Sequence, residues 1–263
     1  MLIDFHTHAF PERIARLTLE FLSEKSGGLQ PVTDGTVRGS KDKMRAWGVD
    51  RSVLLSIATN VRQQTNVNNF AIAQNGGELI AFGSAHPDSP EAISEIERVA
   101  AAGLKGIKFH PEYQGFAIDD KKAYPLYERC CELGLIMVFH AGRDLGFPGS
   151  LAAPPAAAAK VIADFPRAKM VMAHMGGCML WEEVCDTLAG KGGYLDTSFT
   201  AGYLPRELAE RIISKHGAQN VLFGSDSPWA SAKETAEFID SLRLGDDAKE
   251  QIFSKNALRL LEL

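Results

Sequence analysis

The sequence predicts a (β/α)8 barrel of the TIM type, formed by residues 1–263 as a single domain. Three observations predict it: eight short apolar runs, amphipathic segments between them, and a length of 263 residues, which is usual for such a barrel. Several runs are almost wholly apolar, as at Leu135–Phe139, and this is typical of strands buried on both faces in a parallel sheet. No linker and no change in composition marks a second domain.

The eight apolar runs are expected to be the barrel strands. In chain order they are Leu2–Phe5, Ser52–Ala58, Leu79–Ser84, Gly106–Phe109, Leu135–Phe139, Lys169–Ala173, Gly193–Thr197 and Asn220–Gly224. Helical periodicity is clear at Glu91–Ala102, Lys121–Leu133 and Arg206–His216, each followed by a glycine, and at Asp246–Leu263. The competing fold is an open doubly wound sheet, which would carry a glycine-rich loop after its first strand, and residues 4–10 contain no glycine.

Composition and charge narrow the class of protein. Apolar residues make up 45% of the chain, so a large core forms without disulfides. The 28 basic and 33 acidic side chains leave a net charge of −5, which favours neither nucleic acid nor a membrane surface as a partner but allows a small anionic substrate. The four cysteines form no Cys-x-x-Cys pair, and neither a secretory signal nor a membrane-spanning run is visible, so we expect a cytoplasmic protein with reduced thiols.

Histidines gather where the predicted strands end. Six of the seven lie at or just after a strand's carboxyl end: His6, His8, His86, His110, His140 and His174. Asp226 takes the matching place after the eighth strand. In a barrel these ends meet at one face, where active sites of this fold are built. His6 and His8 are two apart and project to the same side of a strand, so the pattern predicts a site for one divalent metal ion, with Zn²⁺ the best fit for a histidine and aspartate shell.

The motifs around these residues resemble the amidohydrolase superfamily, in the branch that includes aminocarboxymuconate-semialdehyde decarboxylase. They are DFHTHAFP at 4–11, GIKFHP at 106–111, FHAG at 139–142, AHMGG at 173–177 and FGSDSPW at 223–229. The resemblance implies that His6, His8, His140 and Asp226 bind the metal and that His174 is the catalytic histidine. A second metal, shared by His140 and His174 and bridged by a carboxylated Lys108, is the less favoured arrangement. A homodimer is an expectation from the resemblance alone.

Such a site supports two reactions that the sequence does not separate. A divalent ion lowers the pKa of bound water toward about 7, Asp226 accepts the proton, and His174 orients the water or steadies negative charge. The first hypothesis is therefore a hydrolase of a small amide, ester or lactone. The alternative is a non-oxidative decarboxylase of a small unsaturated or aromatic carboxylic acid. A third hypothesis, a non-catalytic metal-stabilised binding protein, fits less well because structural zinc sites are closed.

Several rim residues are candidates for contacting a carboxylate-bearing small-molecule substrate. They are Arg143, Lys108, His110, Trp229 and Arg62. An arginine binds a carboxylate through two parallel hydrogen bonds, and Arg143, three residues after His140, is the best placed. His110 is either a substrate contact or a histidine bonded within its turn. Asp4 is expected to face inward, either orienting a ligand imidazole or bonding to nearby backbone.

Overall fold

The fold is the predicted single-domain (β/α)8 barrel, in a computed structural model that describes residues 1–263. The strands are β1 (Ile3–Thr7), β2 (Arg51–Leu55), β3 (Leu79–Ser84), β4 (Gly106–Phe109), β5 (Ile136–Phe139), β6 (Lys169–Met172), β7 (Tyr194–Asp196) and β8 (Val221–Leu222). All are parallel and each pairs with the next. The first and last strands meet where Phe5 N donates to Phe223 O at 2.7 Å and Asp226 N donates to His6 O at 2.8 Å.

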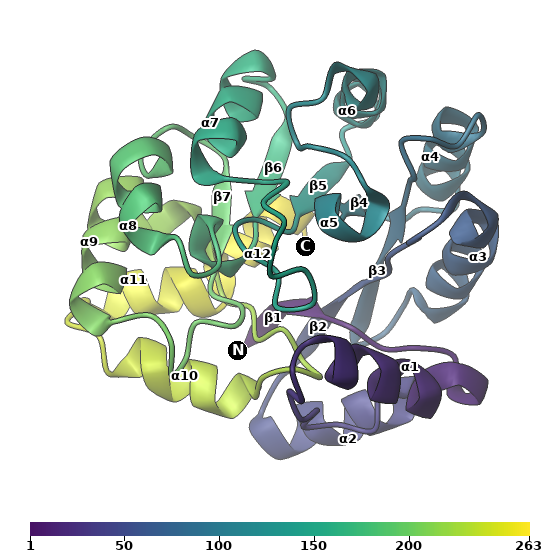
Figure 1. Ribbon diagram of the computed structural model, residues 1–263. Helices are drawn as coiled ribbons and strands as arrows, with labels where there is room; N and C mark the ends of the chain where they lie inside the picture. The colour runs from purple at the N-terminus through teal and green to yellow at the C-terminus, as the bar shows by residue number, and fades with distance from the viewer.

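Helices surround the strands on all sides (Figure 1). They are α1 (Glu12–Lys25), α2 (Val37–Trp47), α3 (Gln64–Gln74), α4 (Ala92–Ala101), α5 (Pro111–Gln114), α6 (Tyr124–Glu132), α7 (Pro155–Asp164), α8 (Trp181–Glu183), α9 (Arg206–His216), α10 (Ala232–Asp240), α11 (Asp246–Glu250) and α12 (Asn256–Leu261). The expected terminal helix is present but is divided by a π-helical segment at Gln251–Lys255. None of the helices combines the length and the apolar character needed to cross a bilayer.

Five strands are shorter than the sequence predicts: β2, β5, β6, β7 and β8. In β2 and β8, other partners replace the ladder hydrogen bonds at the carboxyl end. β2 stops at Leu55, and Ala58 N donates instead to the Ser84 hydroxyl at 3.0 Å. β8 contains only two residues, since Gly224 N donates to the Thr197 hydroxyl at 3.0 Å. These departures lie at the carboxyl ends of the strands, where the backbone leaves the barrel and presents side chains to the site.

A register shift in β1 changes which of its side chains face the barrel interior. The pairing of β1 with β2 shifts between Asp4 and Thr7, which is a β-bulge. Phe5 packs in the barrel interior, edge-on to Phe82 with ring centroids 6.0 Å apart. Asp4 lies outside the barrel, in a layer with Ser52 and side chains of α2. The expectation that Asp4 faces inward is therefore wrong, because the bulge interrupts the alternation on which it rested.

Candidate active site

Three of the predicted ligands converge at the carboxyl end of the barrel. Ligand atoms of His6, His8 and Asp226 all lie within 4.8 Å of one another. Asp226 Oδ1 is 3.4 Å from His6 Nε2 and 3.3 Å from His8 Nε2. All three side chains are buried, and Asp226 keeps 8% of its surface exposed. The backbone of Asp226 lies in the left-handed region at φ 74°, a strained state that is commonest at functional sites.

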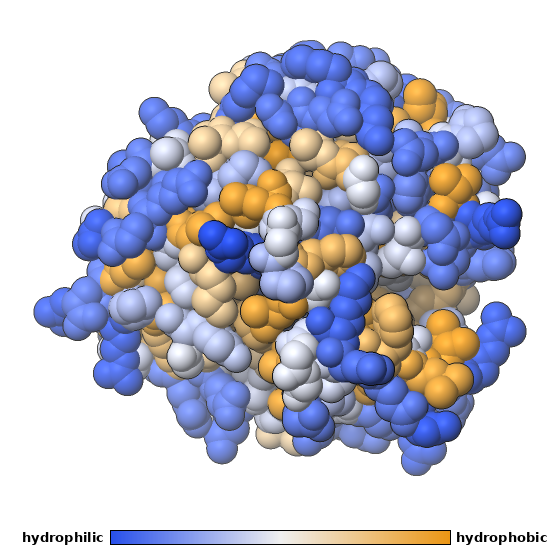
Figure 2. Space-filling view, viewed as in Figure 1, coloured by the Kyte–Doolittle hydropathy of each residue, from blue (hydrophilic) through white to orange (hydrophobic).

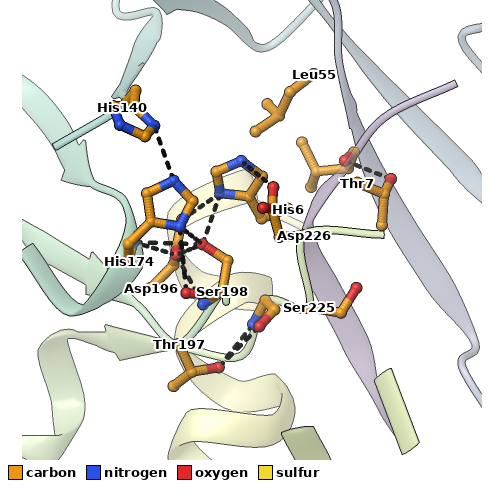
Figure 3. Close-up of polar contacts among 12 residues, drawn as sticks. His6, Thr7, Leu55, His140, His174, Asp196, Thr197, Ser198, Ser225 and Asp226 are labelled. Carbon is orange, nitrogen blue, oxygen red and sulfur yellow. Dashed lines mark hydrogen bonds and ion pairs between the residues drawn. The ribbon is translucent and has the colours of Figure 1, made fainter. Parts of the chain in front are cut away.

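Hydrogen bonds at Nδ1 hold both histidine rings so that each Nε2 is near Asp226, and Figure 3 shows this for His6. His8 Nδ1 donates to Leu55 O at 2.9 Å, and His6 Nδ1 donates to Asp196 Oδ2 at 2.8 Å. Each Nε2 then carries a lone pair directed toward an Asp226 oxygen, which is also an acceptor. No proton lies between Asp226 and either imidazole nitrogen, so these acceptors repel unless a cation lies among them. The Lys108 ammonium, 3.3 Å from His6 Nε2, reaches only one of the two imidazoles. The donor set therefore fits a divalent metal ion, with imidazole and carboxylate as ligands.

Asp196, at the end of β7, is a site residue that the sequence interpretation missed. It is fully buried, and its carboxylate accepts from His6, from the Ser198 hydroxyl, and from the backbone N–H groups of His174 and Ser198 at 3.0 Å each. The signal was present, because an aspartate at the end of the seventh strand satisfies the same positional test as the histidines. Asp196 fixes the tautomer and the orientation of His6.

His174 lies between the first group and His140. Its Nδ1 is 2.9 Å from the Ser198 hydroxyl and 3.2 Å from Ser198 O, and its Nε2 accepts from His140 Nδ1 at 3.0 Å. Burial, and then the neighbouring His140, lower the pKa of His174 to about 4, so the ring is neutral at physiological pH. Like Asp226, His174 has a left-handed backbone, at φ 57°. The predicted catalytic histidine is thus beside the predicted metal ligands.

His140 stands apart from the other three predicted ligands. Its Nε2 is buried with no hydrogen-bond partner and is 3.9 Å from Asp144 Oδ2. The His140 ring stacks on His110 with centroids 4.3 Å apart, and His110 Nε2 is 3.3 Å from the same Asp144 oxygen. His110, His140 and Asp144 therefore form a second group with metal-ligand spacing. The assignment of His140 to the first metal shell stays a prediction.

Lys108 provides a buried positive charge at the centre of the site. Its side chain is 1% exposed, and Nζ donates to His6 Nε2 at 3.3 Å. Burial lowers the pKa of Lys108 to about 8, while the Asp196 and Asp226 carboxylates act in the opposite direction. The lysine is still mostly protonated at neutral pH. It also helps hold the pKa of His6 well below its usual value, after the larger effect of burial.

The remaining predicted substrate contacts are less central. Arg143 and Arg62 are exposed, and neither side chain makes a hydrogen bond. Trp229 is half-buried, next to Asp226 through its backbone N–H, which donates to Asp226 O at 2.8 Å. Asp4 accepts from Ser225 N at 2.9 Å and touches no imidazole, so it braces the backbone of the β8 loop. Substrate roles for the two arginines and for Trp229 stay predictions.

Asp144, the residue after Arg143, points into the molecule, whereas Arg143 is exposed. Asp144 accepts from Gly146 N at 2.7 Å, and this holds the loop after β5 in a turn above His110. Glu112 also borders His110, with its Oε2 3.9 Å from His110 Nδ1 and without a hydrogen-bond partner. Burial raises the pKa of Glu112 to about 7. In irregular loops of this kind, sequence spacing does not reveal which of two adjacent side chains is buried.

Comparison with known proteins places the chain in a family. The amidohydrolase family model matches residues 3–263, whereas no curated protein matches the sequence. A 5-carboxyvanillate decarboxylase from Sphingomonas paucimobilis has a similar structure, with TM-score 0.75 and 20% identity over 100% of this chain and 99% of that one. A dihydroxybenzoic acid decarboxylase with bound manganese, from a Polaromonas species, gives TM-score 0.74 and 16% identity over 100% and 97%.

A 4-oxalomesaconate hydratase from Rhodopseudomonas palustris is also similar, with TM-score 0.64 and 18% identity over 100% of this chain and 96% of that one. At such identities the structural likeness establishes a shared fold. The family model shows more than a shared fold, since it matches residues 3–263, which include the three converging predicted ligands and His174. The chain belongs to the amidohydrolase family, whose members are enzymes that bind a divalent metal ion.

Proposed function

We propose that this enzyme removes carbon dioxide from a small unsaturated or aromatic carboxylic acid without oxidation. The observation that carries the proposal is the buried ammonium of Lys108, 3.3 Å from His6 Nε2 and 1% exposed. A buried cation needs an anionic partner. Of the two nearby carboxylates, Asp196 is occupied by its own donors and Asp226 is among the proposed metal ligands. A substrate carboxylate is the partner that suits Lys108 best.

The protein's own groups supply the rest of the reaction. When bound, the divalent ion acts as a Lewis acid toward substrate oxygen atoms. Breaking the carbon–carbon bond leaves its electron pair on the substrate carbon, which then takes a proton. Asp226 is suited to carry that proton, because 8% of its surface is exposed at the carboxyl end of the barrel. Its Oδ1 lies 3.3 Å from His8 Nε2. Neutral His174 adds no charge to the site and holds His140 through its Nε2, which accepts from His140 Nδ1 at 3.0 Å.

Two of the similar structures are decarboxylases of hydroxylated benzoic acids, and this supports the same substrate class. The bound manganese in one of them leaves Zn²⁺ and Mn²⁺ as the two candidate ions for this chain. We favour a single ion held by His6, His8 and Asp226, with His140 as a further ligand.

Hydrolysis of a small amide, ester or lactone is the second candidate. It is favoured by the placement of Asp226, whose Oδ1 lies 3.3–3.4 Å from both imidazoles, where a carboxylate accepts a proton from an attacking water. Both candidates are catalytic, and membership of an enzyme family excludes the third hypothesis, a non-catalytic binding protein.

A substrate screen separates the two candidates. Purified enzyme, loaded with Zn²⁺ or Mn²⁺, is assayed on hydroxybenzoic acids for carbon dioxide release and in parallel on aryl esters and lactones for cleavage. We expect carbon dioxide release that disappears in Asp226→Asn and weakens in Lys108→Met. Ester or lactone cleavage that depends on Asp226, with no release of carbon dioxide from any acid, would establish the hydrolase instead.

A further inference from the structure

The candidate site lies beneath the loop that follows β5. Five of its side chains are each at most 9% exposed, namely His6, His8, His140, His174 and Asp226. In Figure 1 the teal loop between β5 and α7 runs in front of the strands toward α1, and Figure 2 shows the middle of the same face closed over by side chains. Asp144 in this loop lies above the site, with Oδ2 3.3 Å from His110 Nε2. A substrate therefore enters only after part of this cover moves.

Residues 144–151 of this loop are fastened to the rest of the backbone only at their two ends. Gly142 N donates to Ala153 O at 2.8 Å, which brings the two ends together. Arg143 N donates to Cys178 O at 2.9 Å and fixes the first end on the loop after β6. Between these anchors, every backbone hydrogen bond of residues 144–151 is to another residue of the same segment. The segment is thus an Ω-loop, which is free to move as a unit.

Other loops around the mouth are tied to one another by backbone hydrogen bonds. His8 N, after β1, donates to Ser227 O in the loop after β8 at 2.6 Å. Phe199 N, after β7, donates to Ser225 O at 3.2 Å. Opening any of these loops breaks such bonds, whereas opening residues 144–151 breaks none. This segment is therefore the part of the rim that opens most easily.

Side chains hold the segment down. Phe147 meets Tyr113 of α5 edge-on, with ring centroids 4.8 Å apart. Lys25, the last residue of α1, places its Nζ 3.5 Å from the centre of the Phe147 ring and 4.6 Å from the centre of the Tyr113 ring. The Lys25 ammonium forms neither an ion pair nor a hydrogen bond, so the faces of these two rings are the partners of its charge.

We propose that residues 144–151 form a lid over the candidate site, and that Lys25 holds this lid closed by binding the ring face of Phe147. When the lid opens, the pair Gly142–Ala153 stays in place and the groups below become accessible to metal ion and substrate. The proposal rests on the metal site of the proposed function, but it does not depend on which reaction takes place there.

Release of Zn²⁺ from loaded protein to an excess of chromophoric chelator tests the role of Lys25. In Lys25→Met we expect release and uptake of the ion to become about 2- to 5-fold faster than in wild type, because the cation–π contacts that hold the lid are lost. Loss of a positive charge alone has the opposite effect, since a cation is held better without a like charge nearby. Lys43→Met is the matched control, because Lys43 Nζ lies 5.6 Å from the Trp47 ring within α2. Unchanged or slower release in Lys25→Met, or an equal gain in Lys43→Met, would overturn the proposal.

An engineered disulfide tests the movement itself. A Cβ on Gly146 would lie 3.3 Å from Lys25 Cγ, a separation close to that between a Cβ and the opposite sulfur in a disulfide. In Lys25→Cys with Gly146→Cys, oxidation should slow Zn²⁺ release at least about ten-fold, and reduction should make it faster than in wild type. Each single variant, oxidised and reduced in the same way, controls for the four native cysteines. A pair that fails to oxidise, or a disulfide confirmed by thiol counting that leaves release unchanged, would refute the closed lid.

Failure of the lid and failure of the proposed function give different results. Both tests follow the metal ion alone. A protein that releases carbon dioxide from no acid, but whose Zn²⁺ release responds to Lys25→Met and to the disulfide, would refute decarboxylation and support the lid. Carbon dioxide release by a protein in which neither change alters Zn²⁺ release would refute the lid alone.

Discussion

Replacing Asp196 with asparagine tests whether Asp196 orients His6, the first of the proposed metal ligands. In wild type one carboxylate oxygen accepts from His6 Nδ1 at 2.8 Å, and the other accepts from the Ser198 hydroxyl and from backbone N–H groups. The asparagine carbonyl keeps the latter donors, which turns the amide N–H groups toward His6. His6 then carries its proton on Nε2 and loses the lone pair that faces Asp226. Loss of a group that orients a metal ligand costs 10- to 100-fold in affinity, or about 1.4–2.7 kcal/mol.

The assay is a competition for Zn²⁺ between the protein and a chromophoric chelator at neutral pH. The matched control is Asp4→Asn, another buried carboxylate beside the same strand, which accepts from Ser225 and from His6 N but touches no imidazole. We expect Asp4→Asn to keep the wild-type affinity. If Asp196→Asn binds Zn²⁺ as tightly as wild type, or if both variants weaken equally, the orienting role of Asp196 is refuted.

Three further perturbations probe the substrate cation, the buried acid and the loop after β5. Lys108→Met should keep the metal content, while kcat/KM for a carboxylate substrate falls about 10- to 100-fold, because one charge-assisted hydrogen bond is lost. An unchanged kcat/KM would show that Lys108 does not bind the substrate. Because burial raises the pKa of Glu112 from 4.5 to about 7, the unfolded chain releases this proton first as pH rises, and folding stability falls across that window. Glu112→Gln should therefore gain stability relative to wild type by up to about 3 kcal/mol between pH 4 and pH 8 in urea unfolding, and parallel pH curves would contradict this. Gly142 has φ +85°, and an added Cβ would overlap the Cys178 backbone, so Gly142→Ala should cost about 3 kcal/mol in the same assay; a loss below 1 kcal/mol would show that the loop yields.

The barrel was readable from the sequence because buried parallel strands are apolar throughout and glycines end the helices between them. Arg206–His216 is a helix over the predicted residues, and the strand at Leu79–Ser84 likewise matches. Strand ends were less predictable, as β8 shows, because the partner of Gly224 N is a side chain of another strand. Such partners depend on tertiary packing, which local pattern does not contain.

For the candidate site, the sequence predicted which residues lie at the carboxyl ends of the strands. Position at the carboxyl face selected His6, His8, His174 and Asp226, which the structure brings together or beside one another. The direction of each side chain in irregular backbone was not predictable. Arg143 is exposed while its neighbour Asp144 approaches His110. Asp196 satisfies the same positional test as the histidines, because it lies at the carboxyl end of the seventh strand.

Metal analysis of purified protein tests the central claim most directly. Wild type, His6→Ala and His86→Ala are each incubated with Zn²⁺ or Mn²⁺, freed of unbound ion and measured by elemental analysis. His86 is the matched control, since it is a buried rim histidine that belongs to neither group with ligand spacing. We expect about one equivalent of metal in wild type and in His86→Ala, and a large loss in His6→Ala. Equal metal content in wild type and His6→Ala would contradict it.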